Sequence, residues 1–199
     1  MKLLAATGNA GKLKEIKSIL APYGVETVGL KEAGITLDAE ENGGTFLENA
    51  LIKARACREI TGLPVLADDS GLTVGALGGR PGVKSARYAG ENATDGENVA
   101  KLLAELTGVP EGKRGAAFVC SMVYIDADGE VFSTEGRVEG SITTEPRGKG
   151  GFGYDPVFLI AGTGATMAEA DESLKNSISH RALALAAMAG RIKLKRMCK

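Results

Sequence analysis

The hydrophobic positions near the start of the chain alternate between the spacing of a strand and that of a helix. Residues 2–6 form a short apolar run that is typical of a buried strand. After a glycine-bearing turn, Leu13, Ile16 and Leu20 share one face of a predicted helix. Residues 25–30 then favour a second strand. The chain is therefore expected to open with strand, loop, helix and strand in succession.

Capping boxes predict the starts of two further helices. Thr45 precedes Glu48, and Thr94 precedes Glu97, in each case by the three residues that let the two side chains cap a helix N-terminus. Apolar residues follow both pairs at helical spacing. The polar stretch 38–44 before the first box has no apolar periodicity and is predicted to be a loop. The glycines expected to end these helices are Gly62 and Gly108.

The second half of the chain predicts a hairpin and a final helix. Residues 116–125 indicate a long strand, and the DADG turn at 126–129 suits a hairpin into a strand over 131–138. Part of the sheet would then be antiparallel. From Ser179 the chain is rich in Ala and Leu, and it ends in the cationic stretch 191–199, which suits the negative end of a helix. The expected fold class is a mixed α/β domain.

Length and charge limit the function classes. A chain of 199 residues with 44% hydrophobic content suits one domain, or two lobes around a cleft. With 24 Lys and Arg against 25 Asp and Glu, the net charge is −1. No global basic field exists to hold a nucleic acid, so any phosphate must be bound locally.

Cysteines and apolar runs indicate the compartment. The three cysteines, Cys57, Cys120 and Cys198, are widely spaced and fit neither a disulfide framework nor a CxxC zinc site. No apolar run approaches the length of a membrane span, and the N-terminus lacks the long apolar region of a signal peptide. We expect a soluble cytoplasmic protein that does not associate with membranes.

The loop after the first strand is a candidate phosphate site. Its backbone N–H groups and the following helix N-terminus favour an anion, and Lys12 adds a full charge. It is not a Walker A loop, because Ala6 and Leu13 stand where that pattern needs Gly and Ser or Thr. A plain connection between strand and helix explains the loop equally well. Its residues are Thr7, Gly8, Asn9, Ala10, Gly11 and Lys12.

Four carboxylates are candidate metal ligands. Glu40 and Glu41 lie in the polar loop, and Asp68 and Asp69 are expected at the C-terminal end of a short strand over 65–67. A divalent cation would relieve their repulsion, and Mg²⁺ typically uses one or two carboxylates together with substrate phosphates. Neighbouring strand residues point to opposite faces, so Asp68 and Asp69 are expected to have different roles. The alternative is a solvated loop and an ordinary turn.

Two helix positions and one glycine-rich segment offer further polar and aromatic groups. Asn49 and Lys53 lie four apart on a helix and can reach into one cleft, although a solvated helix face explains them as well. In the segment 150–156, aromatic residues on a flexible backbone can stack on a base or fill the core. Its candidate residues are Phe152, Gly153, Tyr154 and Asp155.

A cluster of donors precedes and begins the last helix. His180 is the single histidine of the chain and is followed by Arg181, while Lys175 lies just upstream. A helix N-terminus disfavours protonation of His180, which would then act as a neutral hydrogen-bonding group. A structural role is the alternative.

The ordered series of motifs resembles one family of enzymes. The sequence is similar to the inosine/xanthosine triphosphate pyrophosphatases from about residue 2 to residue 185. Several motifs in the right order are far more specific than any one loop. In chain order they are TGNAGK, EENGGTFLENALIKA, LADDSGL, LGGRPGVKSARYAG, GGFGYDPVF and SISHRALAL.

The resemblance implies a fold and an activity. The fold would be an elongated mixed sheet flanked by helices, with two lobes, a nucleotide cleft between them and residues 1–199 as one domain in a homodimer. The activity would be Mg²⁺-dependent hydrolysis of inosine, deoxyinosine or xanthosine triphosphate to the monophosphate and pyrophosphate. The ranking of these substrates and the exclusion of guanosine triphosphate stay open.

The resemblance also implies roles for individual residues. The loop 7–12 and Lys53 would hold the triphosphate. Glu40 or Glu41, the choice between them being open, would ligate Mg²⁺ together with Asp69, which would also accept the proton of the attacking water. The implied substrate and base contacts are Ser70, Phe152, Gly153, Tyr154, Asp155, Lys175, His180 and Arg181.

Two other functions use the same residues. A nucleotide sensor would bind without turnover, but a pure triphosphate binder gains little from extra negative charge, so the acidic pair argues against it. A phosphatase would release the γ-phosphate instead. Only the family resemblance indicates attack at the α-phosphorus.

Overall fold

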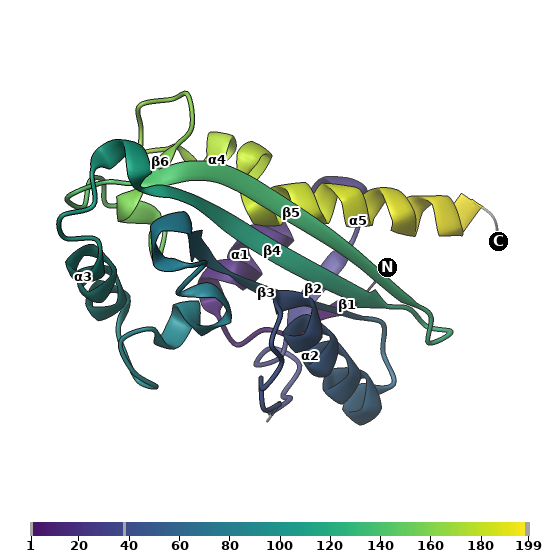
Figure 1. Cartoon of the computed structure of the whole chain (residues 1–199). Coiled ribbons are helices and arrows are strands. Elements are labelled where there is room, and N and C mark those ends of the chain that lie inside the picture. Colours follow the sequence, from purple (N-terminus) through teal and green to yellow (C-terminus); the bar gives the residue numbers. More distant parts are fainter. Residues whose placement is uncertain (1, 38, 198–199) are drawn as a thin grey trace. The chain divides into compact units, whose positions relative to one another are not determined.

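The computed structural model describes residues 2–37 and 39–197 (Figure 1). Asp38, Cys198 and Lys199 lie outside the described residues, as do the side chains of 191–197, so the expectations for Cys198 and for the cationic end stay predictions. The elements are β1 (Lys2–Ala5), α1 (Ala10–Leu20), β2 (Glu26–Gly29), α2 (Phe46–Thr61), β3 (Val65–Val74), α3 (Asp95–Glu105), β4 (Gly115–Ile125), β5 (Val131–Ile142), β6 (Phe158–Ile160), α4 (Glu172–Ile178) and α5 (His180–Met197).

The strands form a mixed sheet, as the hairpin signal predicted. Its order is β2-β1-β3-β4-β5-β6. Strand β1 runs parallel to β2 and to β3, whereas β5 and β6 are antiparallel. A tight turn, in which Asp126 N donates to Glu130 O at 3.0 Å, joins β4 to its neighbour β5. Such a short connection between adjacent strands makes them antiparallel. The predicted fold class, a mixed α/β sheet with helices, is confirmed.

The chain divides into two compact units. Unit 1 comprises residues 1–69, 120–136 and 180–199, and unit 2 comprises residues 70–119 and 137–179. Each of the strands β3, β4 and β5 contributes residues to both units. The expectation of a nucleotide cleft between two lobes stays a prediction.

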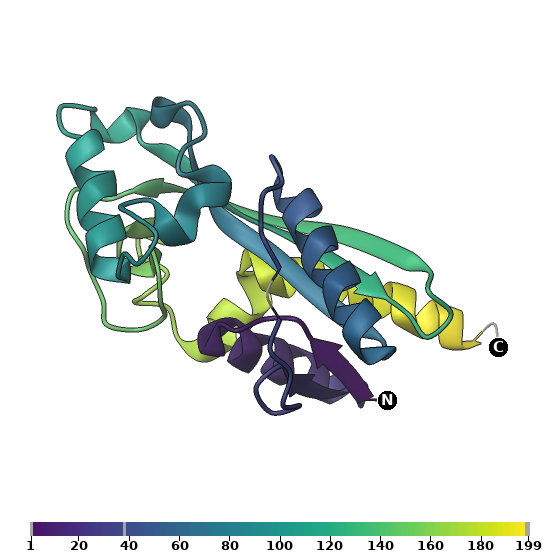
Figure 2. The same ribbon diagram turned by 90° about the horizontal axis from the view of Figure 1, so that it is seen from below.

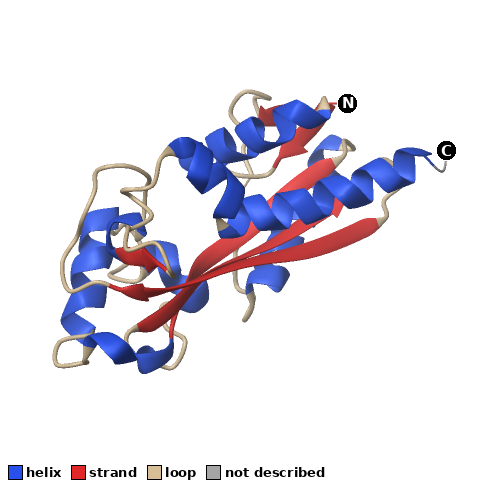
Figure 3. Ribbon diagram, turned by 90° about the horizontal axis from the view of Figure 1, so that it is seen from above, coloured by secondary structure: helices blue, strands red, loops and turns tan. Residues whose placement is uncertain are grey.

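Alternating side chains place the helices of unit 1 on both faces of its strands. Leu3 of β1 and Leu66 of β3 pack in one cluster with Ile16 of α1 and Leu185 of α5. Successive strand residues point to opposite faces, so the next residue along β1 faces the other way. Figure 3 shows α5 in front of the strands from this side.

The opposite face of the unit 1 strands is covered by α2. Leu4, Val65 and Ala67 pack with Ala54 and Cys57 of this helix. Figure 2 shows α2 in front of the strands and α5 behind them. Burial on both faces explains why the strands read as continuous apolar runs in the sequence.

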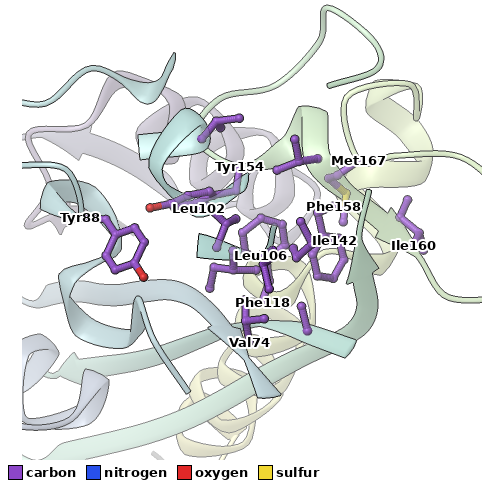
Figure 4. Close-up of a cluster of buried hydrophobic side chains, with 14 residues drawn as sticks. Val74, Tyr88, Leu102, Leu106, Phe118, Ile142, Tyr154, Phe158, Ile160 and Met167 are labelled. Atoms are coloured by element: carbon purple, nitrogen blue, oxygen red, sulfur yellow. The ribbon is translucent and has the colours of Figure 1, made fainter. Parts of the chain in front are cut away.

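Unit 2 has its own hydrophobic core. It joins Leu102 of α3 and Phe118 of β4 to Phe158 of β6 and the ring of Tyr154 (Figure 4). The rings of Phe118 and Phe158 lie 4.4 Å apart between centroids, with a tilt of 39° between their planes. This cluster holds Tyr154 in the core and so anchors the C-terminal end of the glycine-rich segment that precedes it.

The helix boundaries follow the predicted capping chemistry. Both capping boxes form, with Thr45 and Thr94 as N-caps, and Gly62 caps the C-terminus of α2 at a φ of 66°. Helix α3 ends at Glu105 with Leu106 as its C-cap, so the chain leaves the helix before Gly108 is reached.

The prediction of a strand limited to 65–67 is wrong. Strand β3 continues to Val74, and Asp68 and Asp69 lie inside it. The sequence Asp-Asp-Ser-Gly is typical of a turn, but the buried residues Leu72 and Val74 extend the strand, and charged side chains from other elements compensate the two aspartates. Strand β5 likewise reaches beyond 138, to Ile142.

Candidate active site

Asp68 and Asp69 contact different polar and charged side chains of unit 1. Both are buried, at 1% and 8% exposed. Asp68 meets Lys12 of α1 and Arg181 of α5, whereas Asp69 meets Asn49 and Lys53, both of α2. The predicted division of the pair between two faces is therefore confirmed, and it follows from the two-residue repeat of a strand.

Asp68 lies at the centre of a buried ion network. Lys12 Nζ is 3.0 Å from Asp68 Oδ2, and Nε and Nη2 of Arg181 each donate to the same oxygen at 3.3 Å. Arg181 Nη1 also donates to Glu15, and the arginine side chain is only 1% exposed. Burial alone would lower the pKa of Arg181, but neighbouring groups, first Asp68 and then Cys120 and Glu15, raise it above its ordinary value. Arg181 is thus a permanent cation held between two carboxylates.

This placement bears on the role expected of Arg181. The sequence predicted that it donates to the substrate base, and the structure gives three of its N–H bonds to Asp68 and Glu15. His180 starts α5 as predicted, is buried and also belongs to unit 1. Their contact with a base stays a prediction.

Asp69 lies against the polar side of α2. Asn49 Nδ2 donates to Asp69 Oδ2 at 3.1 Å, and Lys53 Nζ lies 3.5 Å from Asp69 Oδ1. The two α2 residues are four apart, so they lie on one side of the helix, as predicted, and both reach the same carboxylate. Burial raises the pKa of the Asp69 carboxyl, although Lys53 and Lys12 act to lower it. A carboxylate with a raised pKa is a better proton acceptor.

Lys53 links Asp69 to the acidic loop. Its Nζ lies 2.8 Å from Glu41 Oε2. Burial would lower the pKa of Lys53, but the charges of Asp69, Asp68 and Glu41 raise it, so the ammonium stays charged. Of the two adjacent glutamates, Glu41 is the one that lies against Lys53, while Glu40 is exposed.

The two carboxylates beside Lys53, those of Glu41 and Asp69, fit a magnesium ion that takes few ligands from the protein. Among the described residues, no group of three or more His, Cys, Asp or Glu side chains is placed to enclose a metal. Mg²⁺ does not require such an enclosure, because it typically binds one or two carboxylates and takes its other ligands from water and phosphate. Glu41 and Asp69 both reach one ammonium, so a cation there meets two carboxylates.

The loop 7–12 forms the N-terminus of α1. Asn9 is the N-cap, and its Oδ1 accepts from Lys12 N at 3.0 Å, while Thr7 Oγ1 accepts from Asn9 N at 3.2 Å. These bonds fix the turn, and Gly8 is exposed with open space around its Cα. The loop therefore connects β1 to α1, as predicted, and the N-terminus of α1 is a favourable place for an anion.

A second polar cluster lies in unit 2 around Asp155. Its Oδ2 accepts from Phe152 N at 3.0 Å and from Lys175 Nζ at 2.6 Å. The Lys175 ammonium also lies 4.9 Å from the centroid of the Phe152 ring. Lys175 comes from α4, a short helix capped by Asp171 that the sequence reading did not predict.

The two aromatic residues of this segment have different positions. Tyr154 is 4% exposed, belongs to the unit 2 core and donates through its hydroxyl to Ser85 O at 2.8 Å. Phe152 is only half-buried. Tyr154 therefore fills the core, one of the two alternatives left open by the sequence, whereas Phe152 retains an accessible ring. Ser70 is half-buried in β3.

Sequence reasoning missed two carboxylates. Glu15 binds Arg181, and its signal was its position one helical turn after Lys12. Asp95 accepts from Gly153 N at 2.7 Å across a separation of 58 residues. No local pattern predicts the second contact. Acidic residues are common in the first turn of a helix, so the position of Asp95 there gives no sign of a distant partner.

No helix in the described part of the chain has the length and apolar character needed to cross a membrane.

The chain matches the family model described as the Ham1 family over residues 3–191.

Similar proteins cover nearly the whole chain. The dITP/XTP pyrophosphatase of Methylococcus capsulatus is 51% identical over 194 residues, covering 96% of each chain. That of Shigella flexneri is 50% identical over 186 residues, covering 92% of this chain and 94% of the relative. The solved structure of the Ham1 protein of Staphylococcus aureus has a TM-score of 0.87 and 38% identity, and covers 98% of this chain and all of that one. Because the match is nearly complete in sequence and in fold, the chain belongs to the Ham1 family.

Proposed function

We propose that the protein hydrolyses non-canonical purine nucleoside triphosphates, namely inosine, deoxyinosine and xanthosine triphosphates, to the monophosphate and pyrophosphate. The observation that carries this proposal is the cluster in which buried Asp69 meets Asn49 and Lys53, with Glu41 on the same ammonium. The name dITP/XTP pyrophosphatase carried by relatives about half identical to this chain supports the substrate class.

The polyphosphate is held by the loop 7–12 and two lysines in this proposal. The N-terminus of α1 supplies backbone N–H groups and a favourable dipole. Lys12 and Lys53 add charge that stabilises the pyrophosphate leaving group. Both lysines are kept in place by carboxylates, Lys12 by Asp68 and Lys53 by Asp69 and Glu41.

Glu41 and Asp69 would hold Mg²⁺. When bound, the ion would neutralise phosphate charge and acidify a water molecule. We favour Glu41 over Glu40 as the loop ligand, because Glu41 lies with Asp69 on Lys53.

Asp69 is the proposed proton acceptor for a water that attacks the α-phosphorus. Burial raises its pKa when no metal is bound, and Asn49 orients it by donating to Oδ2. Loss of the water's proton to Asp69 accompanies formation of the new P–O bond and departure of pyrophosphate.

The base is the proposed ligand of Phe152 and its neighbours. The half-buried Phe152 ring stacks on the purine, with Ser70, Gly153, Asp155 and Lys175 as further proposed contacts. His180, as a neutral imidazole, and the Arg181 cation are the proposed donors to the keto oxygen at C6, which the amino group of adenine cannot replace as an acceptor. Tyr154 supports this segment from the core.

The proposal extends to assembly and location. Residues 1–199 would form one two-lobed domain that acts as a homodimer in the cytoplasm. Light scattering coupled to size exclusion measures the assembly, and a monomeric mass at working concentration would contradict it.

Product analysis tests the activity. The protein is incubated with Mg²⁺ and inosine triphosphate, and the products are followed by ³¹P NMR. We expect pyrophosphate and monophosphate in equal amounts with no accumulating diphosphate, and loss of turnover when EDTA removes the metal. Release of orthophosphate with inosine diphosphate would indicate a γ-phosphatase instead. Tight binding without turnover would indicate a sensor.

A further inference from the structure

The glycine-rich segment before Tyr154 packs closely on the backbone of Ala168 at Gly148 and Gly150, where an added Cβ would lie 2.6 and 2.8 Å from it. Gly148, Gly151 and Gly153 all have positive φ, at 83°, 74° and 61°, a conformation that other residues rarely adopt. A hollow of about 450 Å³ lies between this segment and α3. Beyond Gly150, where the segment borders this hollow, side-chain carboxylates hold its backbone through hydrogen bonds. The hollow is lined in part by Asp95, Val99, Leu103, Lys149, Phe152 and Pro156.

Two carboxylates hold the peptide groups on either side of Phe152. Asp155 Oδ2 accepts from Phe152 N at 3.0 Å, and Asp95 Oδ2 accepts from Gly153 N at 2.7 Å. These N–H groups belong to the peptide planes before and after the Phe152 Cα. Fixing both planes fixes φ and ψ of Phe152 and therefore the direction in which its ring leaves the backbone.

The two carboxylates differ in what anchors them. Asp155 belongs to the same segment and also binds Lys175. Asp95 comes from the first turn of α3, a helix whose start is fixed by the capping box of Thr94 and Glu97 and which packs into the unit 2 core through Leu102. Asp95 therefore ties the glycine-rich segment to a helix that packs into the unit 2 core.

We propose that Asp95 is a positioning residue for base recognition, which presents the Phe152 ring by holding the Gly153 amide. The inference rests on the proposed function, in which Phe152 stacks on the purine. Without the anchor, the segment would populate other shapes, and the apparent affinity for the nucleotide would fall by the fraction of time spent in the competent one. The polyphosphate, held in unit 1, would not be affected.

The test compares Asp95→Ala with Asp95→Asn, because the asparagine side chain keeps an acceptor oxygen at similar volume. Thr94→Ala is the matched control, since it weakens the same helix cap without removing the contact to Gly153. Binding of inosine triphosphate and of base-free tripolyphosphate is measured by calorimetry without divalent metal. Exchange of the Gly153 amide proton is followed by NMR in the same variants.

We expect Asp95→Ala to weaken inosine triphosphate binding about tenfold and to speed Gly153 exchange about tenfold, as for loss of one hydrogen bond to a charged group. Tripolyphosphate binding should stay unchanged. Asp95→Asn should restore most of the affinity, and Thr94→Ala should lower the melting temperature without changing either affinity.

Equal loss of both ligands in Asp95→Ala, or a matching loss in Thr94→Ala, would show that Asp95 acts only through helix stability and would overturn the proposal. Unchanged nucleotide affinity despite faster Gly153 exchange would overturn it as well. The proposed function is tested separately, by product analysis with Mg²⁺. If the wild-type protein binds inosine triphosphate but does not hydrolyse it, the proposed function is refuted, and the role of Asp95 is still decided by the metal-free binding data.

Discussion

Asp68 and Asp69 are neighbours in β3, yet each contacts a different set of cations on opposite faces of the strand. Asp68 meets Lys12 and Arg181, and Asp69 meets Lys53. The ion pairs of the two adjacent carboxylates therefore differ, although Lys12 also lowers the pKa of Asp69. The arrangement separates a carboxylate held within an ion network from one that has a raised pKa and an amide partner.

This separation predicts different outcomes for the two aspartates. Asp69→Asn should keep the fold and lose about 10²-fold or more in turnover, because it removes a proton acceptor and a metal ligand at similar volume. The measurement is the rate of pyrophosphate release, with circular dichroism to check folding.

Asp68→Asn is the comparison within the same strand. It should lower the free energy of unfolding, since Lys12 and Arg181 lose their shared carboxylate. Near-normal turnover in a folded Asp69→Asn protein would transfer the catalytic role to Asp68.

Arg181 is expected to be a large contributor to stability. Arg181→Ala removes the cation between Asp68 and Glu15, and leaving buried carboxylates without it should cost about 3–5 kcal/mol in the free energy of unfolding. Urea denaturation measures the change.

The matched control is Arg137→Ala, which breaks an exposed pair with Glu139 and should cost about 0–1 kcal/mol. Equal effects of the two substitutions would show that the buried network contributes no more than a surface pair.

The two proposed phosphate lysines should act on every triphosphate alike. Lys12→Ala and Lys53→Ala are expected to lower turnover of inosine and xanthosine triphosphates by the same factor, because phosphates carry no information about the base. Steady-state rates with both substrates measure this.

Lys17→Ala is the control, since Lys17 pairs with Glu32 at the surface of the same unit. It should leave turnover unchanged. A loss confined to one base in either lysine variant would contradict the phosphate assignment.

Local chemistry made part of this fold predictable. The capping boxes at Thr45 and Thr94 were readable because their partners lie three residues away. The extent of β3 was not readable, because the stability of Asp68 inside a strand depends on Lys12 and Arg181, which are far away in the sequence. A turn-like tetrapeptide can adopt a strand conformation when residues far away in the sequence compensate its charges.

The same limit applies to the candidate site. Asn49 and Lys53 could be paired from helical spacing alone, and both reach Asp69. The engagement of Arg181 by Glu15 and the contact of Asp95 with Gly153 join segments that no sequence period relates. Such contacts are set by packing of the whole unit.

The last prediction concerns selection of the base. If His180 donates to a C6 keto oxygen, replacing the oxygen by the amino group of adenine leaves polar groups unpaired at a cost of about 1–3 kcal/mol each. Adenosine triphosphate should therefore be a very poor substrate. Phe152 should stack on either purine, so Phe152→Ala should lower kcat/KM for inosine and adenosine triphosphates by similar factors. His180→Ala should instead reduce the preference between them. His180 is the residue to test, because Arg181→Ala would also disrupt the buried ion network and confound the result. If Phe152→Ala abolishes the preference while His180→Ala leaves it intact, selection depends on stacking and the donor hypothesis is wrong.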